Sequence, residues 1–549
     1  MDDRGPDRTH SLLWIGAVLM VTAAVYSPAL MFGFITDDRT LLASVPVWSV
    51  ASIPRFFAHH YWAFITTSDN VTATYYRPIL LLFDFVSYRA LGASVLAWHA
   101  LAILLHLVVT YLVYRMALAL AADEVVALSS ALLFGLHPVH AEVVSWVSGI
   151  SESLTAALII AAFLCWTRRR SLAALSLYCL ALLTKETAVM FPVVLLVFAM
   201  QSDRLTKAVR SISPFLLVTV AYLVVRHVVL GGVMNSLMAT PVHVLLLTCP
   251  SLALFYVQHF VWPVHLSYIY PLNLQSALTV KILMATLMVA CVFFVSFRTA
   301  RFATCWAALF LLPVFYVSGL TNLGIVHDRY LYLPSAGLCI VCGIAFGRLF
   351  ASNRRFAVAA GAIVMALLAS LTVAECRPWR DETALFRRVL ELSPDDRRAT
   401  VPLALALARD GDCTEAEPLA ERALSGGEDA TLRVALGTCY ISQSRLAEAD
   451  DQFQRAIALK PHFVTARLML ALIRVSEQRF PDADDQLNAI AAAHGTQWPG
   501  FHLIRGRVLE SRQDWTGAKA EFRAELAVNP GSAEAQNHLD SLERREGQQ

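Results

Sequence analysis

The sequence predicts an all-α protein in two parts, a polytopic membrane helical bundle followed by a C-terminal helical solenoid. Hydrophobic residues make up 57% of the 549 residues and charged residues only 16%, and the mean hydropathy is +0.56, far from the balance of a soluble protein. Apolar runs of about twenty residues, the length that crosses a bilayer, recur as far as about residue 374. From Glu375 onward the chain is charged and Ala-rich. We therefore expect a membrane domain at 1–375 and a repeat domain at 376–549.

The membrane domain is expected to cross the bilayer about eleven times. Arg4 and Arg8 precede the first apolar run, and no small-residue cleavage site follows it, so we expect a retained anchor rather than a cleaved signal peptide. The stretch 171–200 is interrupted by Lys185 and Glu186 and is either one broken helix or two short ones. The expected crossings are 12–34, 95–117, 125–140, 151–167, 171–200, 214–230, 242–262, 278–297, 303–320, 329–349 and 356–374.

Basic residues give the expected orientation, because they collect in short cytoplasmic loops. With the N-terminus inside and eleven crossings, the C-terminal repeats lie outside. The basic residues that then lie inside are Arg168, Arg169, Arg170, Arg298, Arg301, Arg348, Arg354 and Arg355. In the same order of crossings, Arg204, Lys207 and Arg210 fall on the opposite side, which is an objection to it.

The C-terminal part repeats with a period of about 34 residues, the length of a tetratricopeptide repeat. Small residues occur where paired helices touch, large ones where repeats stack, and Pro at the closing turn. One unit carries all of these anchors, namely Gly437, Tyr440, Ala449, Phe453, Ala456 and Pro461, and equivalents recur at Ala416, Ala420, Ala483, Leu487, Ala518, Phe522 and Pro530. Such an array commonly holds an extended peptide in its groove. Cys413 and Cys439 could pair in an oxidising compartment.

The net charge of +2 gives no electrostatic argument for a nucleic-acid partner, and no basic run with interleaved aromatic residues supplies one. The expected partners are membrane lipid and whatever the polar groups of the membrane domain bind.

Asp37 and Asp38, in FITDDRT, follow the first crossing at the point where the helix emerges into water. Ionisable residues at such a place are held by the membrane domain and reached by a soluble substrate. We expect a membrane enzyme to place its base there. A divalent metal bound by this pair is an option the sequence leaves open, although two carboxylates alone make a sparse site.

Other polar residues interrupt the apolar sequence, and each has a structural alternative. His137, His140 and Glu142 suit contact with a phosphate or acceptor, but also helix capping; their spacing is not a standard zinc pattern. Lys185 and Glu186 either neutralise one another or line a polar cavity. Three further residues with phosphate-binding or membrane-anchoring chemistry are Arg77, Arg329 and Tyr330.

The ordered motifs FITDDRT, YYRPILLLFDFVSYRALG, WHALAILLHLVVTYLVYRMA, HPVHAEVVSWVSGISE, LLTKETAVMFP and HDRYLYLP, followed by the repeats, resemble the TMTC family of membrane protein O-mannosyltransferases and their bacterial relatives. The resemblance implies a GT-C glycosyltransferase fold that takes a sugar from a polyprenyl-phosphate donor on the non-cytoplasmic face. It also implies that an acid of the first external loop is the base, and Asp37 and Asp38 match the acidic pair of the family. The short segment from Trp262 to Leu278 and the small repeat array depart from eukaryotic members, so the donor sugar is mannose or another hexose and the acceptor is protein, lipid or glycan.

The expected enzyme is thus a polyprenyl-phosphate-sugar-dependent hexosyltransferase of the bacterial inner membrane, with periplasmic repeats that bind a protein or peptide acceptor. Asp37 or Asp38 takes the proton of the acceptor hydroxyl, and cations stabilise the leaving phosphate. The expected donor-binding residues are Arg77, Lys185, Arg329 and Tyr330, and the expected cavity residues are His137, His140, Glu142 and Glu186. Two rivals are a non-enzymatic scaffold and an O-antigen ligase or polymerase, which places its key Arg and His in a large late loop, whereas here the long loop comes first.

Overall fold

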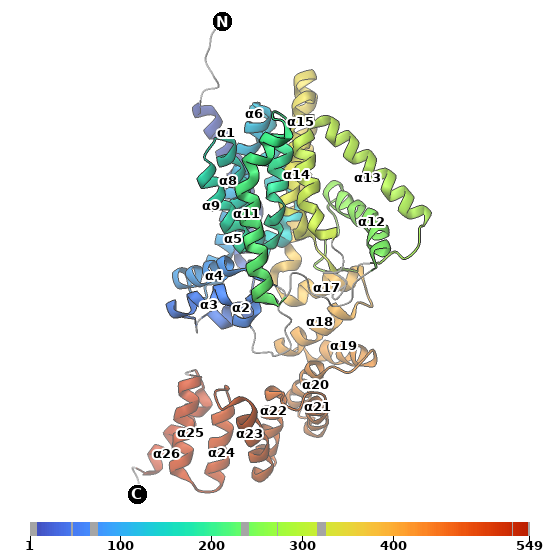
Figure 1. Cartoon of the computed structure of the whole chain (residues 1–549). Coiled ribbons are helices and arrows are strands. Elements are labelled where there is room, and N and C mark those ends of the chain that lie inside the picture. Colours follow the sequence, from blue (N-terminus) through green and yellow to red (C-terminus); the bar gives the residue numbers. More distant parts are fainter. Residues whose placement is uncertain are drawn as a thin grey trace. The chain divides into compact units, whose positions relative to one another are not determined.

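The computed structural model describes residues 8–45, 48–65, 75–231, 241–271, 273–315, 325–529 and 531–546. The chain divides into two compact units, Met1–Arg388 and Val389–Gln549 (Figure 1). The described residues are almost entirely helical, with one pair of two-residue antiparallel strands, β1 (Tyr270–Pro271) and β2 (Ile325–Val326), in the first unit. The expected all-α fold is confirmed.

The first unit contains the apolar helices. They are α1 (Arg8–Tyr26), α2 (Asp37–Ser44), α3 (Ile53–Ala58), α4 (Pro78–Leu91), α5 (Val95–Ala121), α6 (Glu124–Gly135), α7 (Ala141–Ser145), α8 (Ile150–Thr167), α9 (Ser171–Thr184), α10 (Phe191–Ala199), α11 (Leu205–Leu230), α12 (Val242–Val261), α13 (Val280–Thr299), α14 (Arg301–Leu311), α15 (Tyr332–Ser352) and α16 (Arg354–Cys376). Helix α17 (Glu382–Leu392) begins in this unit and ends in the second. Short 3-10 helices include η5 (Pro138–His140), η6 (Val147–Gly149), η7 (Glu186–Met190) and η10 (Asp328–Leu331).

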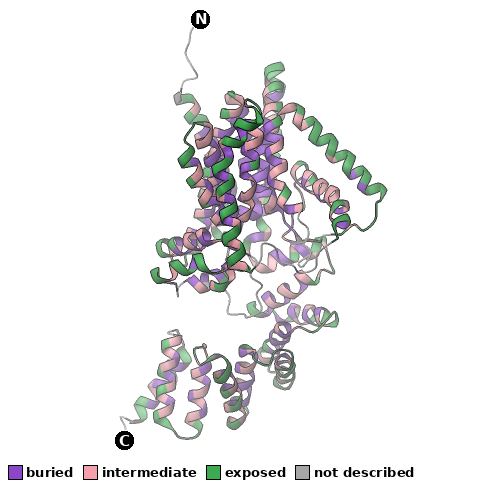
Figure 2. Ribbon diagram, in the orientation of Figure 1, coloured by how far each residue is buried: buried purple, intermediate pink, exposed green. Residues whose placement is uncertain are grey.

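Eight helical segments among the described residues are long and apolar enough to cross a membrane, or nine if α6 and the segment Pro138–Ser145, bent by 51°, form one crossing. Shorter apolar helices occupy Ser171–Thr184, Glu186–Ala199 and Arg301–Phe315. Large apolar side chains are exposed along these helices, above all on α13 (Figure 2), as expected for surfaces that face lipid. The number of eleven crossings stays a prediction, and residues 316–320 of the expected crossing 303–320 lie outside the described part.

Helices α9 and α10 form a hairpin rather than one broken crossing. Lys185, which follows α9, pairs with Glu152 at the start of α8, whereas Phe198 near the end of α10 contacts Phe163 and Trp166 near the end of α8, with ring centroids 5.2 and 5.9 Å apart. Helix α9 therefore runs back along α8, and α10 returns. The hairpin brings Arg204, Lys207 and Arg210, which adjoin α10, to the same end of the bundle as Arg168, Arg169 and Arg170. Arg204, Lys207 and Arg210 then no longer fall on the opposite side, although a hairpin that crosses twice adds one crossing to the expected order.

Helix α12 is tethered to the end of the bundle that carries β1 and β2. Its Thr248 hydroxyl accepts a hydrogen bond from the Gln275 amide at 3.0 Å, a few residues after β1. The Tyr256 hydroxyl donates to the His327 carbonyl at 3.4 Å, directly after β2. Because β1 pairs with β2, both contacts lie at the same end of the unit.

Close helix packing fixes the start of α15, which follows the site described below. A Cβ added to Gly343 would lie 2.1 Å from the Ser130 hydroxyl oxygen of α6, and one added to Gly337 would lie 2.3 Å from the Ala303 carbonyl oxygen of α14. Small residues at these positions let the helices approach closely, as in other membrane bundles.

The second unit is a solenoid of antiparallel helices. They are α18 (Arg397–Asp410), α19 (Cys413–Ser425), α20 (Ala430–Ser442), α21 (Leu446–Leu459), α22 (Val464–Ser476), α23 (Phe480–His494), α24 (Phe501–Ser511), α25 (Trp515–Val528) and α26 (Ala533–Glu546). A Cβ on Gly437 would lie 2.7 Å from the Phe453 ring, and one on Gly506 would lie 2.5 Å from the Phe522 ring, so the same small-against-aromatic contact recurs. The expected tetratricopeptide solenoid is confirmed; Pro530 lies outside the described residues.

Candidate active site

The acidic pair lies on a tight turn that opens α2. The Asp38 amide donates to the Ile35 carbonyl at 3.0 Å, and Thr36 between them has φ 46° and ψ −120°. These angles are those of the first central position of a type II′ turn, which favours glycine. The turn places Asp37 and Asp38 side by side in the first helical turn of α2.

Asp38 is fully buried and held by three hydrogen bonds. One carboxylate oxygen accepts from the Ser148 amide at 2.7 Å and from the Ser148 hydroxyl at 2.5 Å, and the other accepts from the Ile35 amide at 3.3 Å. Burial raises the pKa of Asp38 to about 7, although the bonds from Ser148 and Ile35 oppose the rise, and Asp37 adds to it. Asp38 is therefore fixed in place and titrates near neutral pH.

Asp37 has a different environment, since its side chain is exposed. The surrounding protein nevertheless raises its pKa by desolvation, and the positive charge of Arg329 opposes that rise. Tyr268 is also within electrostatic reach, because burial first and Asp37 second raise the pKa of its hydroxyl. Asp37 is thus the accessible acid and Asp38 the held one.

Arg329 binds Glu142 at the start of η10. Its guanidinium and one carboxylate oxygen form a short ion pair, and its amide donates to the other oxygen at 2.9 Å. The guanidinium also lies over the rings of Trp146 and Tyr330, 5.3 Å from each centroid. Within the described part of the chain, only one of the five N–H donors of Arg329 has a carboxylate partner, so the others can bind an anion.

Two more cation–carboxylate pairs, one partly buried and one buried, join the hairpin tip to neighbouring segments. Arg77 binds Glu186 through two parallel hydrogen bonds of 3.0 and 2.6 Å. Lys185 pairs with Glu152, and its ammonium lies 6.0 Å from the centre of the Tyr330 ring. Lys185 and Arg329 therefore both lie near the Tyr330 ring. The structure brings together all four residues expected at the donor phosphate.

His137 and His140 are placed differently from Glu142. The His137 ring lies against Phe260, with one nitrogen 2.9 Å from the Phe260 carbonyl and the other accepting from the Val139 amide. Both nitrogens of His140 also have protein partners, the Phe134 carbonyl and the Ser335 hydroxyl, each at 2.9 Å. These bonds fix η5 beside α15. Contact of these two histidines with an acceptor stays a prediction. In this arrangement, each of their ring nitrogens already has a protein partner.

The described residues contain no group of three or more His, Cys, Asp or Glu side chains that could hold a metal ion. Asp38 moreover has one carboxylate oxygen bonded twice to Ser148. The residues of the acidic pair thus fit a proton-transfer site better than a metal site, and the divalent metal stays a hypothesis.

The structure adds two residues that sequence reasoning did not place in the site. Ser148 holds Asp38, and nothing in its sequence context distinguishes it from other serines. Asp84 of α4 is 3% exposed, and one of its carboxylate oxygens has no hydrogen-bond partner among the described residues. Burial and the nearby Asp38 raise the pKa of Asp84 to about 8. A lone acid within the apolar run PILLLFDF was the signal that could have identified it.

Comparison with known proteins shows what the repeats and the chain as a whole are similar to. A family model described as a tetratricopeptide repeat matches residues 383–431, 402–463 and 434–497. The protein O-mannosyl-transferase F38B6.6 of Caenorhabditis elegans is 24% identical over 448 residues, which cover 76% of this chain and 63% of the relative. The chain is TMTC-like. TMTC3 of Mus musculus is 28% identical over 28% of this chain and 16% of its own length, and TMTC1 of Homo sapiens is 29% identical over 30% and 20%.

The chain thus spans about two thirds or less of the length of these TMTC relatives. Among solved structures, that of YrrB, described as a TPR protein with an unusual peptide-binding site, is 21% identical, covers 35% of this chain and 96% of that chain, and has a TM-score of 0.25.

Proposed function

We propose that this TMTC-like chain is a membrane glycosyltransferase that moves a hexose, such as mannose, from a polyprenyl-phosphate donor to an acceptor hydroxyl. The observation that carries the proposal is the unequal acidic pair: Asp37 is exposed, while Asp38 is buried and held by Ser148. A base must reach its substrate and must also be held in a defined orientation. The names of the relatives support the same class of reaction.

Asp37 acts as the general base in this proposal. It takes the proton of the acceptor hydroxyl as the acceptor oxygen bonds to the anomeric carbon of the sugar. The bond from that carbon to the phosphate oxygen breaks, and its electron pair stays on the phosphate. Asp38 keeps the turn in place through the hydrogen bonds that its carboxylate accepts from Ser148 and Ile35.

The cations stabilise the charge that develops on the leaving phosphate. Arg329 is the foremost candidate, because it is within electrostatic reach of Asp37 and only one of its guanidinium N–H groups bonds a carboxylate among the described residues. Lys185, which also lies near the Tyr330 ring, suits a second phosphate oxygen. Arg77 has both parallel donors on Glu186 and therefore contributes charge to the site rather than open hydrogen-bonding positions.

The catalytic face is proposed to be extracytoplasmic, with the repeats on the same side. The hairpin of α9 and α10 gathers the basic residues around Arg170 and Lys207 at one end of the bundle, opposite Glu152 and Lys185, and basic ends face the cytoplasm. If α9 and α10 each cross and α12 stays at one end, the number of crossings remains eleven. An odd number places the two ends of the chain on opposite sides.

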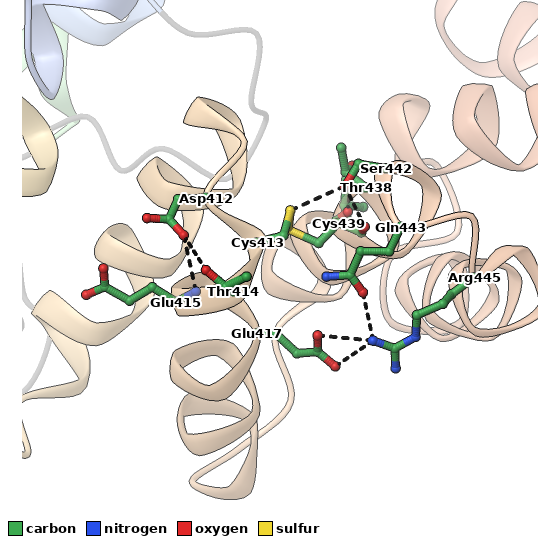
Figure 3. Close-up of a disulfide and its surroundings, with 11 residues drawn as sticks. Asp412, Cys413, Thr414, Glu415, Glu417, Thr438, Cys439, Ser442, Gln443 and Arg445 are labelled. Atoms are coloured by element: carbon green, nitrogen blue, oxygen red, sulfur yellow. Dashed lines mark hydrogen bonds and ion pairs between the residues drawn. A yellow bond between two sulfur atoms is a disulfide. The ribbon is translucent and has the colours of Figure 1, made fainter.

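The disulfide between Cys413 and Cys439 supports this side for the repeats (Figure 3). It links α19 to α20, next to the ion pair of Arg445 with Glu417. Structural disulfides persist in oxidising compartments, of which the periplasm is the bacterial one. We therefore propose a bacterial inner-membrane protein whose periplasmic repeats present a protein or peptide acceptor in their groove.

An assay of purified protein in nanodiscs with a panel of radiolabelled polyprenyl-phosphate hexoses tests the function. We expect transfer from one of these donors to a polymer or protein acceptor. If no donor on the panel supports transfer, and none binds, a non-enzymatic scaffold whose repeats recruit partners is the better account.

A further inference from the structure

The turn that carries the acidic pair has a backbone conformation that threonine rarely adopts. Thr36, with φ 46° and ψ −120°, occupies the turn position that favours glycine, because a Cβ is crowded there. Its buried hydroxyl has no hydrogen-bond partner among the described residues. The Thr36 side chain therefore does not explain why the turn persists, and contacts from elsewhere must hold it.

Those contacts come from the far end of the first unit. The carboxylate of Glu382 accepts a hydrogen bond from the Thr36 amide at 2.8 Å. The Gly33 amide donates to the Arg380 carbonyl, also at 2.8 Å. The Arg39 guanidinium, on the exposed side, lies 3.7 Å from Glu382. More than three hundred residues separate the two segments in sequence, yet hydrogen bonds join them on both sides of the turn.

Apolar packing supports the same junction. Ile35 and Phe32, just before the turn, belong to one buried cluster with Trp379 and Leu385, which flank Glu382 in sequence. The Glu382 side chain is only 11% exposed. A buried carboxylate bonded to a peptide N–H is a stronger and more directional anchor than the same bond in water.

We propose that Glu382 is a positioning residue for the acidic pair: its carboxylate holds the Thr36 amide and so keeps Asp37 and Asp38 in the geometry for proton transfer. Glu382 is the first residue of α17 and directly precedes the first tetratricopeptide match. The segment of the first unit that leads into the repeats thus supplies a structural part of the catalytic turn. The structural half of this proposal, that Glu382 holds the turn, is independent of the proposed function. The kinetic half, that Glu382 thereby raises the rate of sugar transfer, rests on the proposed function.

Hydrogen–deuterium exchange of the full-length protein in nanodiscs tests the structural half. In Glu382→Ala, exchange at residues 34–40 should be about tenfold or more faster, because the Thr36 amide loses its acceptor and the turn opens. Glu382→Gln keeps an acceptor oxygen and should stay near the parent. Glu391→Ala, the same type of change at the other end of α17, should leave this segment unaltered. Unchanged exchange in Glu382→Ala would overturn the proposal.

Transfer from polyprenyl-phosphate mannose, or from whichever hexose donor the parent uses, tests the kinetic half. Glu382→Ala should lower kcat by about tenfold or more with the donor KM within about twofold, since a misplaced base affects the reaction and not donor binding. Glu382→Gln should keep most of kcat. In the Glu382→Ala background, Thr36→Gly should restore most of the kcat lost in Glu382→Ala, because glycine adopts the turn without a tether.

The outcomes separate the two proposals. If exchange rises in Glu382→Ala but kcat does not fall, or if Thr36→Gly fails to restore it, Glu382 does not act through the turn. If the parent transfers no sugar, the proposed function fails, and the exchange measurement still decides whether Glu382 holds the turn.

Discussion

Ser148 donates two hydrogen bonds to a single carboxylate oxygen of Asp38, one from its amide and one from its hydroxyl. The two residues lie 110 positions apart in sequence, so the contact fixes the turn before α2 against η6, just ahead of α8. It also favours the charged form of Asp38, against the burial that raises its pKa. Through this contact, the side chain of one serine shifts the pH at which Asp38 is ionised.

Ser148→Ala should therefore move the acidic limb of the pH–rate profile upward. Because the ionised carboxylate of Asp38 holds the turn that carries the base Asp37, the parent should lose activity as the pH falls through about 7, the pKa of Asp38. Because the hydroxyl bond lowers this pKa, its removal raises the pKa, and less of the pair is ionised at any given pH. We expect a shift of about one pH unit, since the bond to a charged group is worth about 1.5–3 kcal/mol and part of it is replaced. The measurement is kcat from pH 5 to 9.

Ser153→Ala is the matched control, because the Ser153 hydroxyl, also buried, bonds the Ile150 carbonyl. It should keep the parent profile. An unshifted limb in Ser148→Ala would show that Asp38 does not control the rate.

Arg329→Lys should weaken donor binding while the protein still folds. Lysine keeps the positive charge beside Glu142 but loses the planar fork that binds two phosphate oxygens. We expect the donor KM to rise about tenfold, with a smaller effect on the acceptor KM. Arg348→Lys, at the opposite end of α15, is the control. An unchanged donor KM in Arg329→Lys would favour the role of an aromatic-belt anchor.

Variants of the Lys185–Glu152 pair distinguish a structural role of Lys185 from a role in donor binding. Glu152→Gln strands a buried ammonium, so it should lower stability by about 3–5 kcal/mol. The double variant Lys185→Met, Glu152→Gln removes both charges and should regain most of that loss, measured by thermal unfolding in detergent. Transfer should remain low in the double variant if Lys185 binds phosphate. A stable and fully active double variant would restrict Lys185 to a structural role.

A topology reporter tests the proposed orientation. Alkaline phosphatase fused after Gln549 should be active, which reports the periplasm, and a fusion at Ser202 between α10 and α11 should be inactive. The second site distinguishes the hairpin from a single broken crossing, which would place Ser202 outside. Equal activity at both sites would contradict the arrangement.

Some of this architecture follows from the sequence and some does not. The repeats were predictable because Gly437 against Phe453 is a local pattern that recurs with the repeat period. The acidic pair and the cations stood out because charge is costly in apolar sequence. Hydropathy could not show that 171–200 turns back at Lys185, because both arrangements are equally apolar.

Contacts between residues that lie far apart in sequence could not be predicted either. Ser148 holds the acidic turn through its own amide and hydroxyl, and Glu382 holds it through the Thr36 amide. Such contacts leave no periodic pattern in the sequence. His137 and His140 looked like site residues because histidine is rare in such segments, but their ring nitrogens bond carbonyl, amide and hydroxyl groups of the protein. Which groups a buried ring meets depends on tertiary packing that spacing alone does not encode.

The central claim is that Asp37 is the base of a sugar transfer, and Asp37→Asn tests it most directly. The replacement is nearly isosteric, and the side chain is exposed, so expression and detergent stability should match the parent. With the parent's polyprenyl-phosphate hexose donor, kcat should fall on the order of a hundredfold or more, with donor binding retained, and by more than in Asp38→Asn. If Asp37→Asn and Asp38→Asn, singly and together, transfer sugar at the parent rate, the base is elsewhere and the account is wrong.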